Sequence, residues 1–138
     1  MARLVVVALA LSLALSLAVA GTAAGAGSQS PKLVTYLHSG GFTGDVDSLT
    51  VFRSGRADSP SGQFRLTARR LLSLERALAA ARFATLRSAY VPADPVADGY
   101  IDRVSYAGRT VSVAEGANPP LRLQRVLTLL ADVVARKR

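Results

Sequence analysis

The sequence predicts a single small α+β domain, in which an antiparallel sheet of about four strands carries two helices on one face, in the order β-β-α-β-β-α. Two observations support this prediction. Short segments rich in β-branched and aromatic residues come in two pairs, and each pair is joined through glycine. A longer segment with apolar residues at helical spacing follows each pair. Paired hairpins indicate an antiparallel sheet, and amphipathic helices cover one of its faces.

The first pair surrounds a glycine-rich run. Residues 32–38 (KLVTYLH) have the composition of a strand, residues 39–44 (SGGFTG) end it, and residues 46–53 (VDSLTVFR) resume extended structure. A hairpin through residues 39–45 is the simplest connection.

The first helix follows a segment that is rich in turn-forming residues. Residues 54–63 (SGRADSPSGQ) are predicted to be a loop, and residues 64–66 a short extended piece. Thr67 is the expected N-cap of a helix over residues 68–82. Arg82 falls in the predicted last turn, where a cation interacts favourably with the helix dipole. The apolar face consists of Leu71, Leu74, Leu78 and Ala81.

The second pair and the second helix complete the domain. After a loop over residues 88–99, two strands are expected at 100–107 and 109–114, with a tight turn at Ala107-Gly108 because glycine supplies the positive φ that such turns require. Asn118 is the expected cap of a last helix that opens with Pro119-Pro120 and runs to about Ala135. Its apolar residues are Leu121, Leu123, Val126, Leu127, Leu130, Val133 and Val134.

The N-terminal segment has the layout of a secretory signal peptide. Arg3 precedes an uninterrupted run of Leu, Val, Ala and two Ser over residues 4–20, and small residues follow it. The rival interpretation is a single membrane anchor, because the run is near the minimum length for spanning. We expect residues 1–26 to be the signal peptide, cleaved somewhere between 20 and 26, in a secreted or extracytoplasmic protein. The remaining parts are then a disordered arm over residues 27–31, the domain over 32–135, and a basic tail over 136–138.

The charge of the chain restricts its partners. The formal net charge is +8, from 17 basic and 9 acidic residues, which suits nucleic acid, an anionic envelope surface or an acidic partner. The arginines are scattered, without a block interleaved with aromatic residues, so the pattern favours a solvated face over a nucleic-acid site. We expect contact with a membrane only through an uncleaved leader.

Catalytic and metal-binding patterns are weak. His38 is the one histidine, and a triad could be written with Ser39 or Ser105 and several aspartates, but no nucleophile-elbow pattern supports it. Asp45 and Asp47 alternate with Val46 and so share a strand face, which usually marks the solvent side of a strand. These two aspartates with His38 would make a poor metal site, and the chain has no cysteine. The sequence therefore predicts a protein that is not an enzyme and needs no metal or cofactor.

The glycine-rich run is the strongest candidate for function. Its glycines do not make a phosphate loop, because no Lys-Ser or Lys-Thr pair follows and a strand, not a helix, comes next. Phe42 either packs into the core or is offered to a partner, and the sequence leaves both open. The candidate contact residues are Ser39, Gly40, Gly41, Phe42, Thr43 and Gly44.

Several segments together resemble the emfourin-like proteins, which are proteinaceous inhibitors of thermolysin-like metalloproteases. The segments are SGGFTG at 39–44, ARFATL at 81–86, DGY at 98–100, YAGRTV at 106–111 and PPL at 119–121, and the resemblance in their order and spacing covers about Lys32 to Val134. The resemblance implies a compact α+β domain that binds a protease active site and is not itself catalytic. It also implies that the loop around Phe42 contacts the protease. A non-inhibitory extracytoplasmic module, which binds an anionic envelope component or a protein partner, is the alternative.

Overall fold

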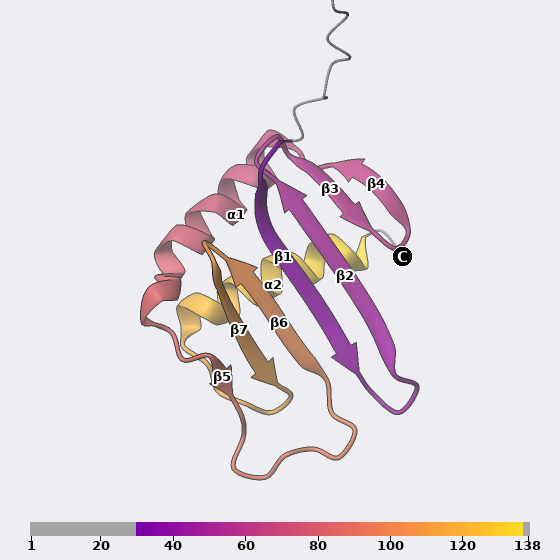
Figure 1. Cartoon of the computed structure of the whole chain (residues 1–138), viewed down its shortest axis with the longest axis vertical. Helices are drawn as coiled ribbons and strands as arrows, with labels where there is room; N and C mark the ends of the chain where they lie inside the picture. Colours follow the sequence, from indigo (N-terminus) through magenta and orange to yellow (C-terminus); the bar gives the residue numbers. More distant parts are fainter. Residues whose placement is uncertain (1–29, 137–138) are drawn as a thin grey trace, which may run out of the picture.

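The computed structural model describes residues 30–136 (Figure 1). Within this range the chain forms seven strands, two α-helices and one 3-10 turn. The elements are β1 (Lys32–Gly40), β2 (Asp45–Phe52), β3 (Arg56–Ser59), β4 (Gly62–Arg65), α1 (Ala68–Ala81), η1 (Phe83–Thr85), β5 (Ala89–Tyr90), β6 (Ile101–Tyr106), β7 (Arg109–Ala114) and α2 (Leu121–Ala135).

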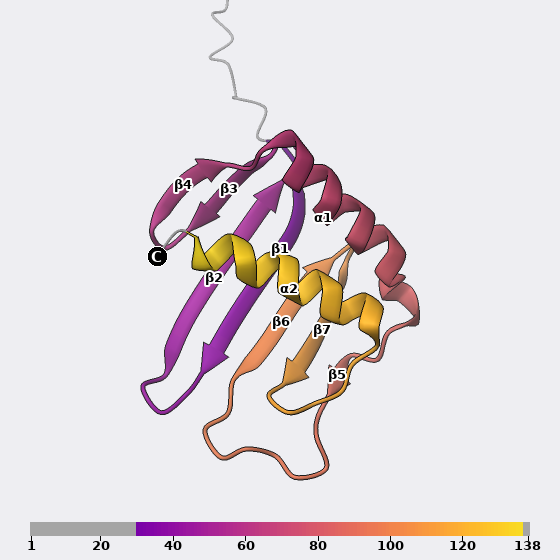
Figure 2. The same ribbon diagram turned by 180° about the vertical axis from the view of Figure 1, so that it is seen from behind.

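The strands form one sheet in the order β4-β3-β2-β1-β6-β7-β5. All neighbours are antiparallel except β5 and β7, which pair in parallel. Both helices lie on the same face of the sheet, as Figure 2 shows. The α+β class is thus confirmed. The expected sheet of about four antiparallel strands is wrong in detail, since the sheet has seven strands and is mixed.

The face under the helices holds the core. Tyr36 lies opposite Leu49 on one side and Val104 on the other, and all three side chains are buried. Burying such side chains is the main driving force for the fold. The helices contribute the apolar stripes that the sequence predicts, with Leu74 and Leu78 fully or almost fully buried on α1. On α2 the buried residues are Leu123, Val126 and Leu130.

The segment 54–63, expected to be a loop, contains β3 and the first half of β4, which form a second small hairpin. Ala57 is its one fully buried apolar side chain. The Arg56 guanidinium lies 3.9 Å from the centre of the Phe52 ring, which gives a cation–π contact. Strands this short show no periodicity of their own, so pairing with β2 and this contact determine the structure.

Helix ends agree with the sequence at two of four positions, and one of the two is the end of α2 at Ala135. The Thr67 hydroxyl accepts a hydrogen bond from the Arg70 N–H, so the predicted N-cap is confirmed. Arg82 is not in the last turn of α1 but is its C-cap, in the left-handed conformation with φ 50°. Asn118 does not cap α2, because Pro120 occupies that position without a side-chain bond. Leu121, expected on the apolar stripe, is 80% exposed, since it begins the helix beyond the edge of the core.

Three predictions about the chain ends, the signal peptide, the arm and the basic tail over 136–138, fall largely outside the described residues. The predicted signal peptide over 1–26 lies wholly outside them. Of the predicted arm, Ser30 and Pro31 are described, and they accept hydrogen bonds from Ser54 and Arg53. Neither helix within residues 30–136 has the length and apolar character needed to cross a bilayer.

Candidate functional site

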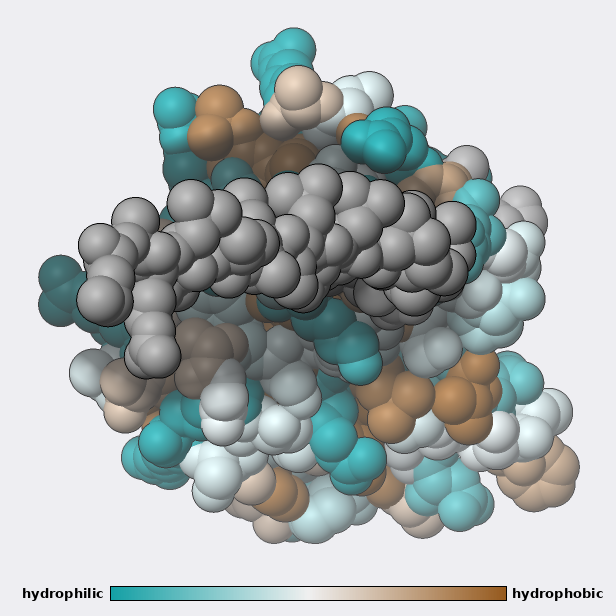
Figure 3. Space-filling view, turned by 45° about the horizontal axis from the view of Figure 1, so that its top comes forward, coloured by the Kyte–Doolittle hydropathy of each residue, from teal (hydrophilic) through white to brown (hydrophobic). Residues whose placement is uncertain are grey.

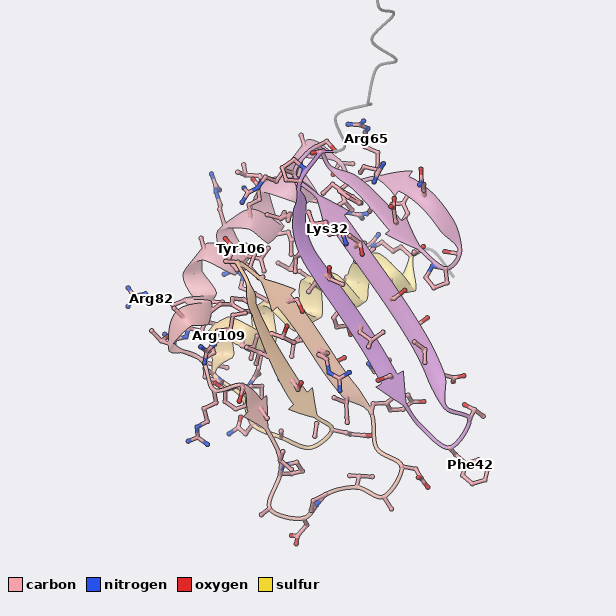
Figure 4. The ribbon with its side chains drawn as sticks, viewed as in Figure 1. Lys32, Phe42, Arg65, Arg82, Tyr106 and Arg109 are labelled. Carbon is pink, nitrogen blue, oxygen red and sulfur yellow. The ribbon has the colours of Figure 1, made fainter. Side chains whose placement is uncertain are left out.

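The glycine-rich run forms the tip of the β1–β2 hairpin, and its phenylalanine points outward. Ser39 and Gly40 end β1, and residues 41–44 make the turn, closed by a 3.0 Å hydrogen bond from the Gly44 N–H to the Gly41 carbonyl. Phe42 is 96% exposed. Figure 4 shows its ring projecting from the end of the hairpin, away from the sheet. The question left open by the sequence is therefore answered: Phe42 is not a core residue.

The loop is held by a second loop that arrives from the other half of the chain. The Gly41 N–H donates a 3.0 Å hydrogen bond to the Asp98 carbonyl. A Cβ on Gly41 would lie 2.5 Å from the Tyr100 hydroxyl oxygen, and a Cβ on Gly40 would clash with the Gly99 carbonyl. Both glycines also have positive φ, at 129° for Gly40 and 74° for Gly41. Glycine is thus required at both positions, for close approach as well as for backbone conformation.

Tyr100 is the centre of this second loop. Its ring stacks on His38, with centroids 4.6 Å apart and the planes 13° from parallel. Its N–H donates to the Glu115 carboxylate at 2.9 Å, and its carbonyl accepts from the Glu115 N–H at 2.8 Å. The segment 98–100 is therefore fixed to Glu115, directly after β7, on one side and to the glycine loop on the other.

A polar cluster underlies both loops. Asp102 Oδ1 accepts a 2.7 Å hydrogen bond from the Tyr36 hydroxyl and lies 2.7 Å from His38 Nδ1. Burial, reinforced by the hydrogen bond to Asp102, raises the pKa of Tyr36 well above its ordinary value of 10.0. The cluster holds His38 between Asp102 and the Tyr100 ring.

This cluster does not have the geometry of a catalytic triad. Ser39 follows His38 in β1, so its side chain lies on the opposite face of the sheet. The Ser105 hydroxyl is hydrogen-bonded to Thr110 at 2.7 Å. In the part of the chain that the structure describes, no serine hydroxyl is hydrogen-bonded to His38.

The structure does not bring a metal site together either. Asp45 and Asp47 do share a strand face, since they lie opposite Gly40 and His38 in the register. Nevertheless, residues 30–136 contain no group of three or more His, Asp or Glu side chains that could hold a metal ion. The combination of His38, Asp45 and Asp47 is therefore not a metal centre in this fold.

A cleft of about 570 Å³ opens beside the two loops, between the sheet and α2. Its walls include His38, Asp102, Glu115, Gln124 and Thr128. Val113 and Leu127 also line it, so the cleft has a mixed polar and apolar lining. We regard it as the flank of the loop site.

Exposed apolar side chains surround the loop. Val46 and Ile101 lie on either side of Ser39 in adjacent strands, on the face that the helices leave open, and are 60% and 36% exposed. Val96, whose carbonyl accepts from the Gly99 N–H, is 54% exposed. In the view of Figure 3, hydrophobic residues form small groups separated by hydrophilic ones.

Sequence reasoning missed the second half of this site. The sequence indicated Asp98-Gly99-Tyr100 only as a part of the family resemblance and not as a partner of the glycine loop. The available signal was the pair of glycine-containing segments, each preceding or following a strand. Their contact depends on β1 pairing with β6, which the sequence order does not specify.

Comparisons with known proteins add no identification. No family model matches the sequence, and no curated protein matches it.

Proposed function

We propose that the protein is a secreted inhibitor-like domain of the emfourin-like family that binds a thermolysin-type zinc metalloprotease through residues 39–44. The observation that supports this proposal best is the exposure of Phe42 on a loop that residues 98–100 hold in place. An aromatic ring this exposed contributes nothing to the core, and aromatic residues are typical anchors in protein interfaces.

In this proposal Phe42 enters the apolar pocket next to the scissile-bond position of the protease. Burying its ring there supplies about 1.5–3 kcal/mol. A carbonyl of the same loop then lies near the catalytic zinc and takes the place of the substrate carbonyl. The domain acts by binding and performs no reaction of its own.

The support from Asp98 and Tyr100 matters for affinity. Ordering a flexible loop on binding costs about 0.5–1.5 kcal/mol for each immobilised side chain. The hydrogen bond from Gly41 to Asp98 and the packing against Tyr100 fix the loop before it meets a partner. A fixed loop avoids most of this cost.

The test is residual activity of thermolysin-type proteases incubated with the protein, followed by competition with a small zinc-binding active-site inhibitor. We expect dose-dependent inhibition that the small inhibitor competes away. If no protease of a broad panel is inhibited, the proposed function is wrong.

The alternative is a non-inhibitory module that binds an anionic envelope component. Exposed arginines on α1, such as Arg69 and Arg76, favour it, since neither forms an ion pair within residues 30–136. Salt separates the two proposals. Binding driven by these charges weakens steeply between low and high ionic strength, whereas insertion of Phe42 into a pocket weakens much less.

A further inference from the structure

The charges of the domain are unevenly distributed. Residues 38–47 and 91–102 contain five of the nine acidic residues and neither lysine nor arginine, although the whole chain has a net charge of +8. Figure 4 shows Lys32 and Arg65 near the end of the molecule opposite Phe42. The end that presents Phe42 is therefore acidic in an otherwise basic protein.

The same two segments carry most of the exposed large apolar side chains of the sheet end. Phe42 and Val46 come from the first segment, and Val91, Val96 and Ile101 from the second. The hydrogen bond from Gly41 to Asp98 joins the segments, so they form one surface and not two separate loops. We call this surface, residues 38–47 with 91–102, the two-loop surface.

Three of its carboxylates are not neutralised within the domain. The ion pairs inside residues 30–136 are His38–Asp102 and Arg56–Asp58. Asp45, Asp94 and Asp98 are exposed and take part in neither. Asp45 directly follows the Phe42 loop, and Asp98 supplies the carbonyl that holds it.

We infer that the two-loop surface docks onto a protein whose apolar pocket is bordered by lysine or arginine side chains. This inference rests on the proposed function and narrows it, because it selects proteases with a positively charged rim around the pocket that receives Phe42. Opposite charges around a central apolar anchor accelerate association and fix orientation. The same charges exclude an anionic envelope component from this surface.

The experiment compares two double variants that change net charge equally. Asp45→Asn with Asp98→Asn removes two charges from the two-loop surface. Glu75→Gln with Asp132→Asn removes two from the helices, where neither side chain forms an ion pair within the described residues. Asn tolerates the left-handed backbone at position 98, where φ is 56°.

The readout is the association rate constant with the thermolysin-type protease that the protein inhibits most strongly. We expect the loop variant to associate about threefold to tenfold more slowly at low ionic strength, with a smaller difference at high ionic strength. The helix variant should stay within about twofold of the unmodified protein. Equal rates for the two variants, or faster association of the loop variant, would overturn the inference.

A second readout does not depend on any protease. The probe is a short peptide in which arginines flank a central pair of leucines, titrated into the labelled protein and followed by amide chemical shifts. We expect shift changes concentrated in the two-loop surface, weaker in the loop variant and unchanged in the helix variant. Changes spread over the whole domain, or none at all, would overturn the inference. If the peptide binds in this way but no protease is inhibited, only the proposed function fails.

Discussion

The two hairpins at the centre of the sheet differ in what their turns do. The β6–β7 turn at Ala107-Gly108 uses two positive φ angles, 50° and 76°, and a Cβ added at Gly108 would meet no atom within 4 Å. The β1–β2 turn packs Gly40 and Gly41 against residues 99–100 and exposes Phe42. The turns lie at opposite ends of the sheet (Figure 1). The β6–β7 turn only connects two strands. The β1–β2 turn is supported by residues 99–100, so it can hold the Phe42 side chain ready for a partner.

The largest effect expected from this difference is that of Gly40→Ala. The new Cβ would clash with the Gly99 carbonyl, and φ of 129° is unfavourable for alanine. We expect the free energy of unfolding to fall by about 3 kcal/mol, measured by urea denaturation. Gly44→Ala is the matched control, because Gly44 also has positive φ, at 66°, but open space around it. An equal decrease in the free energy of unfolding for Gly40→Ala and Gly44→Ala would mean that the glycine loop and the segment 98–100 do not support one another.

The next largest effect concerns the polar cluster of Tyr36, His38 and Asp102 that underlies the β1–β2 turn. Tyr36→Phe removes the hydrogen bond to Asp102. We expect the free energy of unfolding to fall by about 2 kcal/mol near neutral pH, because the acceptor is a carboxylate.

The pH dependence of this variant sharpens the test. Because the pKa of Tyr36 is raised in the folded state, the unfolded state releases that proton first as pH rises above about 10. The unmodified protein should therefore lose its stability advantage over the Tyr36→Phe variant above that pH. Urea denaturation at pH 8 and pH 11 measures the difference in the free energy of unfolding between the two proteins. A difference at pH 11 that is equal to or larger than the difference at pH 8 would contradict the role assigned to Tyr36.

The smallest effect is expected at the other hairpin. Gly108→Ala meets no steric obstacle and carries only the cost of a left-handed alanine, about 1 kcal/mol. Protease inhibition should not change, since this turn is at the far end of the sheet. Weaker inhibition by Gly108→Ala, at unchanged fold, would show that the two ends are not independent.

The elements that the sequence predicted have strong local signals. Thr67 precedes an amphipathic helix, and glycine follows Ala107 between two strand-like segments, so the cap and the turn could be assigned from neighbouring residues alone. The β3–β4 hairpin was missed because its strands hold one buried apolar residue, Ala57, and depend on pairing with β2.

The candidate site shows the same limit. The Phe42 loop could be located from its glycines, but the side chain's direction could not, since it depends on contacts distant in sequence. The residues that hold the loop, Asp98 and Tyr100, come from a segment more than fifty positions away. Their contact follows from the pairing of β1 with β6, a long-range choice that local composition does not encode.

We propose that Phe42 is a binding residue and not a structural one, and Phe42→Ala separates these two roles. Two quantities are measured on the same preparation: the free energy of unfolding and the inhibition constant against a thermolysin-type protease. We predict a free energy of unfolding within about 0.5 kcal/mol of the unmodified protein, because the ring is 96% exposed. We predict inhibition weakened about 100-fold, the loss expected for an interface anchor. Unchanged inhibition at unchanged stability, or a large loss of stability, would contradict a binding role for Phe42.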